Sequence, residues 1–258
     1  SVVTLACACS AETWQSAAAK VRAGPHAPLK PCKLEYRLSW RDSVNAGSMV
    51  FEFAPPDAKK VGKLVCRGRA KSTGAAAALY PYGGNFWSEM QPESHKSLLF
   101  HSTERRGREA TELTNRFGAK GVESIETESK PKKAPKTTNR NFSYTPVSDV
   151  FAAMLLVRSQ SLANGDMVRL ALHPFDNPYM LRVKVLGREA HAGRAAIKLQ
   201  IGLNKIHRGT MKLLPYKKLT RDAILWLSDD AERIPLEFRA PVFIGDVRAT
   251  LLRHESYR

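Results

Sequence analysis

The chain has 258 residues, of which 43% are hydrophobic, and it carries a formal net charge of +17 at pH 7. This apolar content is enough to bury a core, which excludes a wholly disordered protein, and the length suits one large all-β domain or two small ones. No run of 18 or more apolar residues occurs, so we predict no integral membrane span, and the excess of basic residues favours anionic partners.

Residues 1–30 are predicted to be the remnant of a signal, or a tail, followed by a linker. Residues 1–11 are apolar and then rich in small side chains, which is typical of the cleavage region of a secretory signal. Cys7 and Cys9 are candidates for a lipid anchor, and a docked or disordered tail is the alternative interpretation. We therefore expect an exported protein, located in the periplasm, at the outer membrane or outside the cell.

Residues 31–146 show the alternation of half-buried strands. Leu34, Tyr36 and Leu38 share one face of a first strand, and the turn at Ala46-Gly47 leads into a second strand, which forms a hairpin with the first. Further strands are predicted at 63–69, 98–100 and 112–117, and a short Ala-rich helix at 75–80. The polar composition of residues 123–140 predicts a mobile, solvated loop around the lysines at 130–136.

One long helix is predicted at residues 147–158. Ser148 or Asp149 can cap its free N–H groups, and Phe151, Met154 and Leu155 recur at helical spacing. This apolar stripe indicates core packing rather than a ligand pocket. The segment that contains this helix ends at a turn predicted at Gly165-Asp166.

Short alternating strands fill the rest of the chain, at 168–172, 179–185, 197–203, 224–227, 236–240 and 247–251. Their spacing predicts an all-β, mainly antiparallel fold, barrel-like or a doubled split β-barrel, with one prominent α-helix and one short Ala-rich helix. We expect a single domain over residues 31–258. The alternative is two strand-rich halves, 31–146 and 167–258, around the helix at 147–158.

Two blocks of the sequence carry a resemblance to a known family. The first, at 147–166, comprises Asp149, the helix with Arg158, and Gly165-Asp166. The second, at 226–251, runs from Trp226 through the turn at 228–230, Pro235 and Gly245 to a closing strand. Both resemble DUF3108, a family of bacterial exported proteins of unknown function. The resemblance implies a bacterial exported protein, but it supplies no catalytic residue and no ligand.

Metal-binding and redox motifs are missing from the sequence. None of the four cysteines lies in a Cys-x-x-Cys spacing. Cys32 and Cys66 could form a disulfide, which is one of the three pairings that four cysteines allow, or remain buried thiols. The spacing of His95 and His101 suits neither one helix turn nor one strand pair. We predict no metal site and no cofactor.

Basic residues are concentrated between residues 188 and 221, where Glu189 is the one acid among nine cations. This concentration favours a non-catalytic envelope or secreted binding protein whose partner is a polyanion: an acidic glycan, lipopolysaccharide or nucleic acid. The predicted binding residues are Arg194, Lys198, Lys205, Arg208, Lys212, Tyr216, Lys217, Lys218 and Arg221.

Carboxylates at the ends of predicted elements suggest an alternative, enzymatic function. If two of Asp149, Asp229 and Asp230 converged, their pKa values would separate, and the pair could act on a protein or glycoprotein substrate as an acid-optimum hydrolase of the aspartic protease or glycosidase type. The structural alternative is a turn formed by Ser228 and Asp229, with Asp230 paired to Arg233. The sequence leaves open whether the protein is an enzyme.

Overall fold

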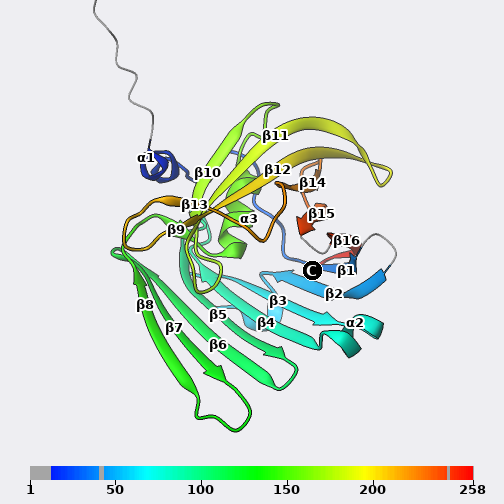
Figure 1. Ribbon diagram of the computed structural model, residues 1–258. Helices are drawn as coiled ribbons and strands as arrows, with labels where there is room; N and C mark the ends of the chain where they lie inside the picture. Colours follow the sequence, from blue (N-terminus) through cyan, green and yellow to red (C-terminus); the bar gives the residue numbers. More distant parts are fainter. Residues whose placement is uncertain (1–12, 41–43, 243–244, 258) are drawn as a thin grey trace, which may run out of the picture.

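The computed structural model describes residues 13–40, 44–242 and 245–257, so the predicted signal remnant with Cys7 and Cys9 lies outside the described residues. Within these ranges sixteen strands form one sheet (Figure 1). The strands of the first half are β1 (Cys32–Trp40), β2 (Val44–Phe53), β3 (Leu64–Ser72), β4 (Tyr82–Met90), β5 (Ser97–Arg106), β6 (Glu109–Gly118), β7 (Gly121–Ser129) and β8 (Lys136–Phe142). Those of the second half are β9 (Val147–Ser148), β10 (Met167–Leu172), β11 (Tyr179–His191), β12 (Arg194–Ile206), β13 (Leu213–Pro215), β14 (Ala223–Ser228), β15 (Pro235–Val242) and β16 (Gly245–Ser256).

The two ends of the chain meet in the middle of the sheet, because β1 pairs with both β2 and β16. From β1 the sheet runs through consecutive strands to β8 on one side, and through β16, β15, β14, β12, β11 and β10 to β9 on the other. These pairings are antiparallel, apart from the short parallel contact of β9 with β10. The fold is therefore mostly β and largely antiparallel, as the sequence predicted.

The helix α3 (Val150–Ser159) fills the space between the two halves of the sheet (Figure 1). Phe151 and Leu155 pack with Leu34 and Phe53 of the first half, whereas Leu156 packs with the apolar side chains of β10, β11 and β12. Because α3 is buried on two faces, the apolar side chains predicted at 147–158 pack in the core. The remaining helices are short: α1 (Trp14–Ala19), α2 (Gly74–Leu79) and a 3-10 turn at Pro56–Ala58.

The two edge strands, β8 and β9, are consecutive in the sequence, and a buried polar network lies beside them. Arg208, in the loop after β12, donates to the carbonyl of Asn141 on β8 (3.0 Å) and lies 3.3 Å from Nε2 of His173. His173 donates its backbone N–H to the carbonyl of Ser148 on β9, and Asn115 of β6 contacts the other ring nitrogen of His173 at 3.2 Å. This network ties the edges of the sheet to its interior.

The loop predicted at residues 130–136 corresponds to a turn at 130–135, but the strands on either side of it were not predicted. Residues 121–129 and 136–142 form the hairpin β7–β8. The hairpin buries few side chains, among them Val122 and Phe142, so its strands lack the apolar alternation by which the other strands are recognised. The helix predicted at 147–158 also begins later, at Val150, because residues 147 and 148 form β9.

Candidate functional site

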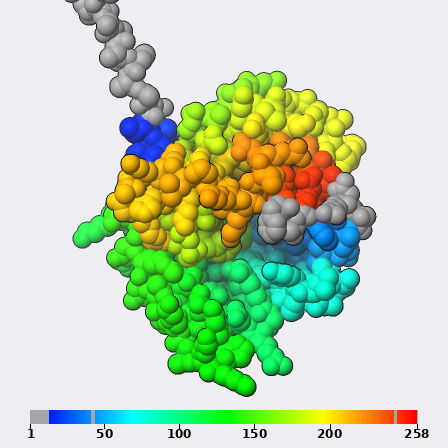
Figure 2. All heavy atoms as spheres, viewed as in Figure 1, coloured from blue at the N-terminus to red at the C-terminus, as the bar shows by residue number. Residues whose placement is uncertain are grey.

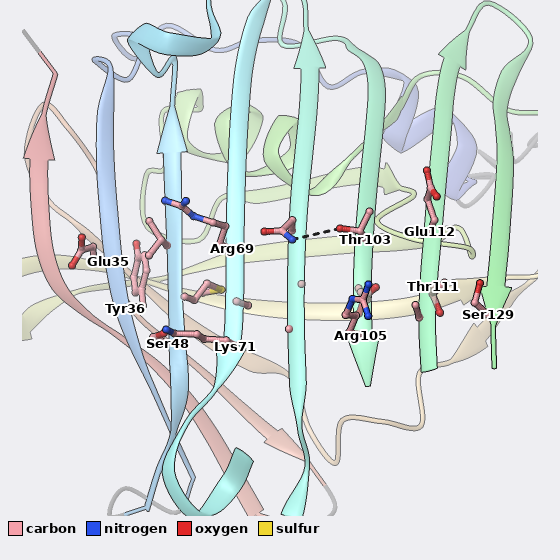
Figure 3. A pocket seen from close by; sticks show the side chains of 18 of the residues that line it. Glu35, Tyr36, Ser48, Arg69, Lys71, Thr103, Arg105, Thr111, Glu112 and Ser129 are labelled. Carbon is pink, nitrogen blue, oxygen red and sulfur yellow. Dashed lines mark hydrogen bonds between the residues drawn. The ribbon is translucent and has the colours of Figure 1, made fainter. Parts of the chain in front are cut away.

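A hollow lies on the face of the first half-sheet that points away from α3. Cys66 belongs to the core around α3, and a Cβ on Gly68 would lie 3.0 Å from Phe151, so these positions of β3 face the helix. Side chains alternate along a strand, and therefore Arg69 and Lys71 point to the opposite face. The hollow, here called the outer groove, crosses β1 to β7 and has a volume of about 790 Å³ (Figure 3).

Polar and charged side chains line the outer groove. Within the described residues, most of its charges already have partners: Arg69 lies 3.5 Å from Glu52, and Glu35 pairs with Lys33. Asn85 donates to Thr103 at 3.5 Å across β4 and β5. The sequence did not predict this groove. The signal that could have found it is the run Arg67, Arg69 and Lys71 at alternate positions of one strand, which places three cations on one face.

The basic residues predicted to bind a polyanion divide into two groups. In the first group the side chains already have protein partners: Arg194 pairs with Asp230 (3.1 Å), and Lys198 pairs with Glu189 (3.2 Å) and lies over the ring of Trp226. Arg208 is half-buried in the network at the sheet edges. Tyr216 packs edge-on against Tyr179 and is also half-buried, which raises the pKa of its phenol.

The second group lies from the end of β12 to the start of β14 and is here called the basic segment: Lys205, Lys212, Lys217, Lys218 and Arg221. Lys212, Lys217 and Lys218 are exposed, and in the part of the chain that the structure describes these three and Lys205 have no ion-pair partner. Arg221 is 3.9 Å from Asp246 with a largely exposed side chain. Figure 2 shows this region as an orange band across the visible face of the molecule.

The candidate catalytic carboxylates are held by structural bonds in two separate places. Asp149 is fully buried at the start of α3, where it accepts hydrogen bonds from Ser88, Ser97 and the backbone N–H groups of Phe151 and Ala152. Burial raises the pKa of Asp149, and these four donors oppose the shift. Asp229 and Asp230 lie instead in the turn between β14 and β15.

Asp230 accepts the hydrogen bonds of this turn, whereas the sequence suggested a turn formed by Ser228 and Asp229 with Asp230 paired to Arg233. Its Oδ1 accepts from the Ser228 hydroxyl (2.8 Å) and from the backbone N–H groups of residues 232 and 233, while its ion-pair partner is Arg194. Partial burial raises the pKa of Asp230, but these hydrogen bonds outweigh it and the net shift is downward. Arg233, the partner expected from the sequence, donates to the carbonyls of residues 158 and 161 instead. Asp229 pairs with Arg188 at 3.0 Å.

Within the described residues Cys32 and Cys66 are buried thiols that do not form a disulfide with each other. Their strands, β1 and β3, are separated by β2, and Phe53 lies between the two positions in the register. Across the described ranges, no group of three or more His, Cys, Asp or Glu side chains is arranged to hold a metal ion. None of the helices described is long and apolar enough to cross a membrane.

Residues 35–252 match the family described as protein of unknown function DUF3108. The chain belongs to the DUF3108 family. The match includes both blocks of resemblance, the first half-sheet with the outer groove, and the basic segment. No curated protein matches the chain.

Two solved structures are similar to this DUF3108 chain at low sequence identity. One is a β-barrel-like protein of the domain of unknown function DUF1849 from Brucella abortus, with a TM-score of 0.54, 12% identity, and coverage of 90% of this chain and 99% of that chain. Another is a candidate exported protein with a YmcC-like fold from Bacteroides fragilis, with a TM-score of 0.31, 8% identity, and coverage of 92% and 100%. The first similarity supports a β-barrel-like architecture and nothing beyond the fold.

Proposed function

We propose that this DUF3108 protein is an exported, non-catalytic binding protein that engages polyanions through the basic segment. The supporting observation is the distribution of ion pairs. Arg188, Arg194 and Lys198 are neutralised by neighbouring acids, whereas Lys205, Lys212, Lys217 and Lys218 have no acidic partner within the described residues. Cations without such partners can exchange their counterions for the charges of a polyanion, which is the main source of affinity for such ligands.

Apolar side chains beside these lysines favour one kind of polyanion. Leu213 and Leu214 on β13 are 38% and 40% exposed, and they directly follow Lys212. An anion that also carries an apolar part, such as lipopolysaccharide, gains contact with these leucines. An acidic glycan or a nucleic acid would use the lysines alone.

The triple variant Lys212→Glu, Lys217→Glu, Lys218→Glu is expected to abolish this binding at physiological salt and to leave only weak binding at low salt. For the parent protein, the logarithm of the binding constant should fall linearly with the logarithm of salt concentration. Losing three anion contacts should reduce that slope by about 2 to 3. Titration of fluorescent heparin, duplex DNA and lipopolysaccharide between low and physiological salt measures both quantities.

A matched control separates the basic segment from net charge alone. Lys130→Glu, Lys132→Glu, Lys133→Glu makes the same change in charge on the exposed turn between β7 and β8. This variant should keep most of the affinity of the parent. Equal losses in the two triple variants would show that only the overall charge attracts polyanions, and the assignment to the basic segment would be abandoned.

A further inference from the structure

A gap between two exposed cations lies in the outer groove, on the half of the sheet remote in sequence from the basic segment. Lys71 of β3 pairs with Gly83 of β4, and Gly83 pairs with Arg105 of β5, so the three residues form one row across the sheet. A Cβ added to Gly83 would meet nothing within 4 Å. The row therefore consists of two exposed cations with open space between them, and Figure 3 shows Lys71 and Arg105 on the strands that flank β4.

The electrostatic setting of this row favours a negative group. Lys71 and Arg105 have no ion-pair or hydrogen-bond partner for their side chains among the residues that the structure describes, whereas Arg69 on the neighbouring row is next to Glu52. Glu112 also lines the groove, but it lies on β6 in the row of Arg69, 3.9 Å from His101. If both side chains turn toward the gap, their charges repel each other unless an anion lies between them.

The dimensions of the gap suit a tetrahedral oxyanion. Neighbouring strands lie about 4.8 Å apart, so the backbones carrying Lys71 and Arg105 are separated by about 10 Å. An oxyanion that accepts charge-assisted hydrogen bonds of about 2.8 Å from each side fits within this span. The stem of Lys71, which extends toward Ser48 in Figure 3, is flexible enough to swing back over Gly83.

We propose that the outer groove binds a phosphate or sulfate group carried by a saccharide-sized polar ligand, with Lys71 and Arg105 holding the oxyanion above Gly83. The groove volume of about 790 Å³ is in the range of small-ligand sites. Ser48 and Ser129 line the groove on either side of the two cations and supply hydroxyl groups to the polar remainder of the ligand. This site is independent of the basic segment and of the function proposed for it.

Backbone amide chemical shifts of the full chain test this site, with glucose 6-phosphate, glucose 6-sulfate and glucose as probes. Both anionic sugars should produce saturable shifts centred on Gly83, Gly84 and the neighbouring residues of β3 and β5, whereas glucose should produce none. Binding of only one of the two anionic sugars would identify whether phosphate or sulfate is preferred. Binding of glucose as tightly as its anionic derivatives, or no saturable shift in the groove with either derivative at low salt, would overturn the proposal.

Three substitutions in the groove sharpen the test. Lys71→Gln and Arg105→Gln should each weaken binding about tenfold or more, because each removes a charged donor. Gly83→Asp places a carboxylate in the open gap and should abolish binding while leaving the fold intact. Arg116→Gln is the matched control, because Arg116 is an exposed cation on the same face of β6 that does not line the groove.

The outcomes for the groove and the basic segment are separable. The triple glutamate variant at Lys212, Lys217 and Lys218 should leave the groove shifts unchanged, and Gly83→Asp should leave heparin binding unchanged. A loss in Arg116→Gln as large as that in Arg105→Gln would show attraction by general surface charge and would exclude a defined site.

Discussion

Replacing Asp149 with alanine is expected to lower the free energy of unfolding by about 3 to 5 kcal/mol. The carboxylate caps α3 through the N–H groups of Phe151 and Ala152, and loss of an N-cap alone costs about 1 kcal/mol. The hydroxyls of Ser88 and Ser97 also donate to it inside the core, and each buried donor left without a partner costs about 1 to 3 kcal/mol. Urea denaturation followed by circular dichroism measures the loss.

Two control variants separate the loss of the buried Asp149 network from the loss of a carboxylate in general. Asp149→Asn keeps the capping oxygen and should cost about 1 to 2 kcal/mol, less than alanine. Asp166→Ala removes a carboxylate that accepts bonds in an exposed turn, from Ala163 N–H and Ser161, and should cost about 1 kcal/mol or less. If Asp149→Ala and Asp166→Ala lost equal stability, the buried network would not hold α3 in the way described here.

This role of Asp149 bears on the hydrolase hypothesis. Removing a carboxylate that caps the central helix destabilises the fold. The variant would therefore lose activity whether or not the carboxylate is catalytic. Asp229 and Asp230 are likewise engaged, in ion pairs with Arg188 and Arg194. No arrangement among these three residues favours acid–base catalysis over a structural role, so a variant that loses an activity must first be shown to remain folded.

The strands that could be predicted are those that bury one face against α3. Leu34, Tyr36 and Leu38 of β1 alternate with polar residues because the helix covers only one side of the sheet. Strands such as β7 and β8 could not be predicted, because they lie at or next to an edge, where little core remains to be covered. The pairing of β1 with β16 is also invisible to periodicity, since it joins residues more than 200 positions apart.

The sequence predicts where basic residues are concentrated, but not which of them are paired with acids in the fold. A count of basic residues between 188 and 221 finds the region, yet it cannot show that Arg194 is neutralised by Asp230, 36 positions away, while Lys217 has no acidic partner among the described residues. The gap in the outer groove depends on register as well: Lys71, Gly83 and Arg105 become neighbours only through two antiparallel pairings. Because these contacts join residues that are distant in the sequence, the sequence alone does not predict which cations are neutralised by a neighbouring acid.

His173 is expected to make the fold sensitive to mild acid. Burial, and then the charge of Arg208, lower the pKa of His173 to about 3, against about 6.5 in an unfolded chain. The contacts agree with this shift, because donor groups of Asn115 and Arg208 face the two ring nitrogens. The neutral ring can accept a hydrogen bond from one of them, whereas the charged ring, with an N–H on each nitrogen, can accept from neither.

The sign of the effect follows from which state takes up the proton. Above pH 6.5 the ring is neutral in both states, and His173 contributes no pH dependence. Below pH 6.5 the unfolded chain binds a proton that the folded protein excludes, so stability falls by about 1.4 kcal/mol per pH unit as the pH approaches 3. The total loss from this group is of the order of 4 to 5 kcal/mol.

Urea denaturation between pH 5 and 7 should resolve this contribution through two variants of the same network. His173→Gln removes the titrating ring, and its stability should fall less steeply with decreasing pH than that of the parent. Ser124→Ala removes the hydroxyl that donates to Asn115 (2.5 Å), which weakens the network without removing a titrating group, and it should keep the parental slope. Other buried histidines, such as His95, whose pKa is also lowered by burial, contribute equally to all three proteins and cancel in the comparison. Equal slopes for His173→Gln and the parent would mean that the folded protein accommodates a charged ring between β6 and the loop after β12, so that His173 does not limit the acid stability of this fold.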